Sequence, residues 1–100
     1  MDKKIKRAWM KALRSGKYKK GLGALHPTDD TFCCLGVLAK IQGKKIPVDM
    51  TQSHLPPNLA RKAGLDLDIQ INLARRNDGS MPFKRKHSFK KIADWIEKNL

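Results

Sequence analysis

The sequence predicts a mainly α-helical fold, a small single domain over residues 1–100. We expect about four to five helices joined by glycine- and proline-rich loops. Apolar residues recur at helical spacing near both ends, and a near-uncharged apolar run fills residues 31–41 between two basic regions. Glycine and proline lie between these segments, where they stop helices. The pattern also allows a short β-strand pair near residues 45–50.

The composition indicates a globular chain rather than a disordered or membrane-spanning one. A hydrophobic fraction of 40% is typical of a globular chain and too high for a disordered one. No window approaches the roughly 18 apolar residues of a membrane span. The basic N-terminus is not followed by the apolar stretch of a signal peptide. We therefore expect a cytoplasmic protein without a membrane partner.

The N-terminal segment is predicted to be a helix. Its apolar stripe has spacings of three and four residues and comprises Ile5, Ala8, Trp9, Ala12 and Leu13. Asp2 suits the start of this helix and Gly16 its end. The lysines on the other faces are most simply a solvated surface, and the alternative is a helix that lies on phosphates.

Residues 15–27 are expected to form an irregular loop, because three glycines and Pro27 interrupt any regular structure. Tyr18 lies among Lys17, Lys19 and Lys20. Basic residues around an aromatic ring can hold a nucleic-acid strand by charge and stacking. The alternative, which we favour, is that Tyr18 anchors the loop on the core.

The apolar run predicts a buried helix from about Asp30 to Gln42, with residues 28–31 as caps and Gly43 as its stop. Gly36 weakens a helix but lets another helix approach closely. This predicted helix is the centre of the core.

Cys33 and Cys34 are the only cysteines. Neighbouring cysteines rarely bridge each other, so we expect two reduced thiols buried in the core. Two alternatives are weaker. One is a zinc site that the cysteines form with His26, and the other is a thiol nucleophile paired with His26, His54 or His87. Adjacent side chains diverge by about 100° on a helix, and an apolar setting raises a thiol pKa.

The middle of the chain is the least regular part. Lys45–Met50 is a candidate edge strand, because Pro47 cannot donate to a central ladder. Pro57 suits the first position of a short helix that ends at Gly64. The alternation of apolar and polar residues over 65–76 slightly favours a strand.

The alternative over residues 65–76 is a helix capped by Asp66 or Asp68. Residues 77–80 have the composition of a turn, and a basic loop follows. Ser88 is a suitable N-cap for the last helix. The apolar stripe of this helix comprises Phe89, Ile92, Ala93 and Ile96.

The net charge of +13 on 100 residues favours a polyanionic partner, most commonly DNA or RNA. The candidate phosphate-binding residues are Lys17, Lys19, Lys20, Arg75, Arg76, Lys84, Arg85, Lys86, Lys90 and Lys91. Residues 55–73 also resemble a helix-turn-helix, although base-reading side chains occur only at Asn72, Arg75 and Arg76.

No sequence pattern indicates catalysis. Zinc spacing, an acid/base carboxylate pair and a phosphate-binding glycine loop are all missing. We therefore expect no catalytic residue, no metal, no cofactor and no enzymatic activity.

Several motifs resemble a small family of tailed-phage and prophage proteins. They are W-x-x-A-L-R-S-G-K-Y from Trp9, F-C-C-L-G-V-L from Phe32, L-A-x-x-N-D from Leu73 and S-F-x-x-I-A-D-W-I-E from Ser88. The family has no established activity, so the resemblance assigns no functional residue. It implies a phage-encoded protein in the bacterial host cytoplasm, and a helix before Asn77.

These observations lead to two functional hypotheses. The first is a non-catalytic phage-type accessory protein that binds nucleic acid through a strongly basic surface. The alternative is an inhibitor or modulator that binds an acidic surface of a host protein.

Overall fold

The computed structural model describes residues 1–100 and contains five helices and two very short strands. In chain order they are α1 (Lys3–Arg14), β1 (Lys19–Lys20), β2 (Thr31–Phe32), α2 (Cys34–Ile41), α3 (Pro57–Ala63), α4 (Leu67–Asp78) and α5 (Phe89–Asn99). The prediction of a small, mainly helical fold with one strand pair is confirmed.

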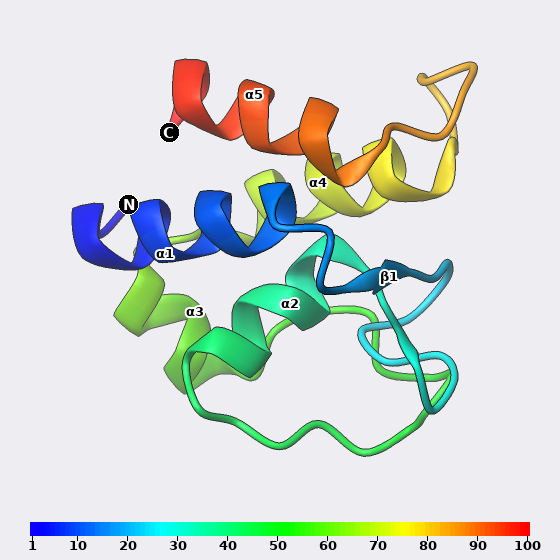
Figure 1. The fold of residues 1–100 in the computed structure, drawn as a ribbon, viewed down its shortest axis with the longest axis horizontal. Helices are drawn as coiled ribbons and strands as arrows, with labels where there is room; N and C mark the ends of the chain where they lie inside the picture. Colours follow the sequence, from blue (N-terminus) through cyan, green and yellow to red (C-terminus); the bar gives the residue numbers. More distant parts are fainter.

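Four of the helices surround the core. α1 packs against α5 and α2, and α4 packs against the same two helices from the other side (Figure 1). α3 lies near the N-terminus, where the Asp2 amide donates to the Ala63 carbonyl over 2.9 Å. The largest fully buried side chains come from α1, α2, α4, α5 and the loop before β2. This arrangement leaves the loop between α4 and α5 at one end of the molecule.

The predicted boundaries of α1 and α5 are confirmed. The Ile5 amide donates to the Asp2 carboxylate over 2.8 Å, and the Lys91 amide donates to the Ser88 hydroxyl over 3.1 Å. Gly16 follows α1 with a φ of +76°, a conformation that favours glycine. These caps are local, so the sequence alone identifies them.

The central helix begins later than predicted. It starts at Cys34 rather than Asp30, because residues 31–32 form a parallel strand pair with residues 19–20. The cap is the Cys33 sulfur, which accepts from the Gly36 amide at 3.4 Å, and not the polar residues 28–31. Only an isolated bridge, His26 with Asp49, occurs near residues 45–50. The strand pair therefore lies elsewhere than expected, partly in the segment predicted to be an irregular loop.

Gly36 permits a close approach, but its neighbour is a loop and not another helix. A Cβ atom at this position would lie 1.9 Å from the Leu25 carbonyl oxygen. That oxygen also accepts a hydrogen bond from the Cys33 amide. A side chain at position 36 would therefore displace the loop that precedes β2.

Residues 67–78 form a helix, as the family resemblance implied, and the slight preference for a strand was wrong. The Ile69 amide donates to the Asp66 side chain over 2.9 Å, which caps the start of α4. The buried residues of α4 are Gln70, Leu73 and Asn77, at helical spacing. Because two of the three are polar, counting apolar residues cannot detect this stripe. The predicted turn at 77–80 is also displaced, since α4 continues to Asp78 and ends at Gly79.

Asn77 is fully buried and connects three segments. Its side-chain oxygen accepts from the Cys34 amide at 3.1 Å, and its side-chain nitrogen donates to the Gly21 carbonyl at 2.9 Å. Its backbone carbonyl accepts from the Lys20 ammonium at 2.8 Å. We call these three hydrogen bonds the Asn77 network. Through them, the last turn of α4 holds the start of α2 and the end of β1.

Replacing Asn77 by alanine should lower the free energy of unfolding by about 2–4 kcal/mol. The Cys34 amide and the Gly21 carbonyl would be left without partners inside the core, where water cannot replace them. Urea unfolding followed by circular dichroism measures this change.

Asn58→Ala is the matched control, because Asn58 is exposed on α3 and should change stability by no more than about 0.5 kcal/mol. Equal destabilisation of the two variants would show that the Asn77 network contributes nothing specific to stability.

Candidate nucleic-acid interface

The loop over residues 79–88 carries the densest group of exposed cations. It joins α4 to α5 and projects from the end of the molecule where these helices meet (Figure 1). Lys84, Arg85 and Lys86 are all exposed on it. The His87 amide donates to the Arg76 carbonyl over 2.9 Å, which fixes the end of the loop against α4.

Three cations lie near His87. Desolvation lowers the pKa of His87 below its ordinary value, and the charges of Lys91, Arg76 and Lys20 lower it further. Lys86 lies close enough to Lys20 to lower the pKa of that ammonium. The His87 Nδ1 atom is buried and has no hydrogen-bond partner. Positive charge therefore gathers around a ring whose buried Nδ1 atom has no partner.

Arg76 is held between two aromatic rings. Its guanidinium carbon lies 4.5 Å from the ring centre of Phe83 and 4.5 Å from that of Trp95. Its Nε donates to the Asn72 side chain over 2.7 Å. Both rings and Arg76 are partly exposed, so this cation–π group reaches the surface.

Lys20, predicted as a phosphate ligand, has a structural role. Its ammonium donates to the carbonyls of Asn77 at 2.8 Å and His87 at 2.9 Å. Burial lowers the pKa of this ammonium, and the Asp78 carboxylate opposes that effect. Lys20 therefore connects the end of the basic loop to β1. Its positive charge also lies near His87.

Lys17 and Lys19 do not join the cluster. The Lys17 ammonium lies 5.8 Å from the centre of the Tyr18 ring, and Lys19 forms an ion pair with Asp30 at 3.7 Å. Tyr18 is partly buried and packs edge-on against Phe32, with 5.9 Å between ring centres. The interpretation of Tyr18 as an anchor for its loop is confirmed.

The carboxylates of α5 do not neutralise the basic residues at its start. Asp94 and Glu97 both accept from the Arg14 guanidinium at 2.7 Å. They therefore face α1, and Lys90 and Lys91 take part in none of the three ion pairs of the structure. The start of α5 remains a concentration of positive charge.

We define the His87 surface as His87 together with the exposed or partly exposed cations on the end of α4, the loop that follows it and the start of α5. These are Arg75, Arg76, Lys84, Arg85, Lys86, Lys90 and Lys91. None of them forms an ion pair within the chain. The surface brings together seven of the ten residues predicted to contact nucleic acid.

The helix-turn-helix interpretation has little support from side-chain geometry. α3 and α4 are helices joined by a turn at Gly64, as that motif requires. However, the Arg76 side chain donates a hydrogen bond to Asn72, so of the three base-reading candidates only Arg75 is both exposed and free of such a bond.

Residues 1–62 match the family model of a domain of unknown function, DUF8296. The chain belongs to this family. No curated protein and no solved structure matches it. The match to DUF8296 spans α1, β1, β2, α2 and most of α3. The His87 surface lies entirely outside it, on the last third of the chain.

Cys33 and Cys34 lie within the DUF8296 match as free, buried thiols. Burial raises the pKa of Cys33 to about 11 and that of Cys34 well above its ordinary value. Thiolates are therefore disfavoured at neutral pH. His26 stacks on Phe32, with 4.2 Å between ring centres, and its Nδ1–H donates to the Ile46 carbonyl.

The structure contains no group of three or more histidine, cysteine or acidic residues arranged to hold a metal ion. None of its helices has the length and apolar character needed to cross a membrane.

Three contributors to the site were missed at the level of sequence. The sequence suggests His87 only as a base for a thiol, and it does not link Phe83 and Trp95 to Arg76. Each contribution depends on tertiary contacts between α4, the loop and α5. A local signal existed in the mixture of Phe83 with Lys84, Arg85 and Lys86, which is typical of nucleic-acid contacts.

Proposed function

We propose that this protein is a non-catalytic accessory protein that binds DNA or RNA through the His87 surface. The observation that carries the proposal is the set of seven exposed or partly exposed cations of the His87 surface, none of which forms an ion pair within the chain. Like charges held together raise the free energy of the folded protein. Phosphate groups would relieve this repulsion and release their own counterions.

The partly exposed rings of Phe83 and Trp95 support contact with bases as well as phosphates. Aromatic side chains and arginine planes stack on unpaired bases, whereas a duplex offers mainly phosphates and groove edges. The exposed Lys84, Arg85 and Lys86 follow Phe83 on the same loop. The arrangement favours a single strand with little dependence on base sequence.

The motif resemblance to tailed-phage and prophage proteins supports a place of action in the bacterial cytoplasm. Nucleic acid is abundant there, both from the host and from an infecting phage. We include a phage origin in the proposal on this ground.

Replacing Lys84, Arg85 and Lys86 by glutamine should weaken binding to a labelled single strand and flatten its salt dependence. For each phosphate that the variant no longer neutralises, the slope of log affinity against log salt should fall by about 0.7. Fluorescence anisotropy over a series of salt concentrations measures both quantities.

The matched control replaces Lys40, Lys44 and Lys45 by glutamine, which removes the same charge from exposed positions around the end of α2. This variant should keep most of the affinity and the slope. Equal weakening in both variants would show diffuse attraction to a +13 chain and would contradict the proposed surface. Absence of binding at low salt would favour a host-protein partner instead.

Binding should tighten as pH falls from 7.5 to 5.5. In the free protein the lowered pKa keeps His87 neutral over more of this range. A bound phosphate raises the pKa of His87, so the complex takes up a proton more readily and is favoured at lower pH. We expect a gain of about three- to tenfold. Anisotropy with an oligothymidylate, whose bases do not titrate in this range, measures the gain.

His87→Gln should remove most of this pH dependence. His54→Gln is the control, because His54 is exposed and lies outside the His87 surface. An unchanged pH profile in His87→Gln would exclude His87 as the titrating group.

The same lowered pKa affects stability. The unfolded chain binds a proton at His87 more readily than the folded chain does, so stability falls as pH drops through the ordinary histidine value of about 6.5.

A further inference from the structure

A second surface feature lies at the other end of the molecule. A pocket of about 240 Å³ opens where α1, the end of α2 and α3 meet. Its lining residues are Lys4, Ile5, Ala8, Ile41, Gln42 and Lys62. We call it the Lys62 pocket. Figure 1 shows α3 and the start of α1 far from the loop between α4 and α5.

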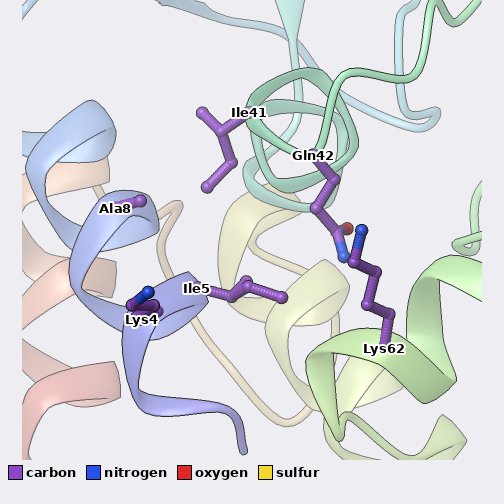
Figure 2. A pocket seen from close by; sticks show the side chains of 6 residues that line it. All are labelled: Lys4, Ile5, Ala8, Ile41, Gln42 and Lys62. Carbon is purple, nitrogen blue, oxygen red and sulfur yellow. The ribbon is translucent and has the colours of Figure 1, made fainter.

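The floor of the Lys62 pocket is apolar. Ile5 and Ala8 face it from α1, and Ile41 faces it from α2 (Figure 2). Both isoleucines are partly exposed although they pack against the core. An aliphatic side chain of a partner could cover them and remove that area from water.

Cations and one unpaired acceptor border this floor. Lys4 and Lys62 are exposed and line the pocket, which has no acidic lining residue. Gln42 donates from its side-chain nitrogen to the Leu59 carbonyl over 3.2 Å, so its amide orientation is fixed. The Gln42 Oε1 atom is buried and has no partner. Figure 2 shows the Lys62 ammonium directed toward this amide.

We propose that the Lys62 pocket docks an acidic peptide segment that carries one aliphatic side chain. The aliphatic group would cover Ile5, Ala8 and Ile41. Carboxylates beside it would pair with Lys4 and Lys62. A protein segment supplies both the aliphatic group and the carboxylates within two or three residues.

A nucleic-acid strand fits this pocket less well. Its phosphodiester backbone has no aliphatic side chain to cover the floor. Further cations, Lys40, Lys44 and Lys45, border the adjacent end of α2 and add to the attraction for an acidic partner. The proposal is independent of nucleic-acid binding at the His87 surface, and both partners could be held at once.

The test uses the full chain and a blocked heptapeptide with one leucine between pairs of aspartate and glutamate. Two control peptides replace the leucine by serine, or consist of glutamate alone with the same charge. Binding is measured by calorimetry and by amide chemical shifts at low salt. The leucine peptide should bind about tenfold more tightly than either control and shift the amides of Ile5, Ile41 and Gln42.

Neighbouring residues on α3 provide a matched pair of variants. Lys62→Glu should weaken binding of the leucine peptide by about tenfold, whereas Arg61→Glu should change it little. Both residues are exposed in the last turn of α3, but only Lys62 lines the pocket. A second pair of variants repeats the comparison on α1. Lys4→Glu should weaken binding, because Lys4 lines the pocket, and Lys11→Glu should change it little.

Three outcomes would overturn the proposal. They are equal binding of the glutamate peptide, equal weakening in Lys62→Glu and Arg61→Glu, and displacement of the leucine peptide from the pocket by an oligonucleotide. The first two would indicate diffuse charge attraction, and the third would make the pocket part of a nucleic-acid surface. None of these results depends on whether the His87 surface binds nucleic acid.

Discussion

The buried amide of Asn77 is the interaction on which the rest of the structure depends. A polar side chain without solvent must have its hydrogen bonds satisfied by the protein. Asn77 achieves this through the Cys34 amide and the Gly21 carbonyl, which fixes α2 and β1 against α4. The first residue of α2 is held on its other side as well, since the Trp9 indole donates to the Cys34 carbonyl over 2.9 Å. Helices that are distant in sequence therefore meet at this one position.

The Asn77 network also fixes the position of the basic loop. The Lys20 ammonium donates to the carbonyls of Asn77 and His87, so the loop end and the end of α4 share one partly buried ammonium. Arg76 fixes the loop from the opposite side through Phe83 and Trp95. Hydrogen bonds to carbonyl groups and contacts with aromatic rings thus hold Lys20 and Arg76 close together, although their charges repel each other. Such a surface is preorganised for an anion, because folding already supplies the free energy needed to hold its like charges close together.

Local features of the fold could be predicted from the sequence, and features that depend on long-range contacts could not. The caps at Asp2 and Ser88 and the stop at Gly16 need only neighbouring residues. α4 was ambiguous because Gln70 and Asn77 replace apolar residues on its buried face. For the candidate site, charge density identified the loop, but the separation of Lys20 as a structural cation required the tertiary structure.

Chemical-shift mapping tests the central claim most directly. The protein is labelled with ¹⁵N and titrated with a single-stranded oligothymidylate at low salt. We predict that the largest changes fall on residues 75–76 and 83–91 and on the Trp95 indole, while the amides of α1 and α3 change little. Changes spread evenly over the lysines of the whole surface, or no change at all, would contradict an interface at the His87 surface.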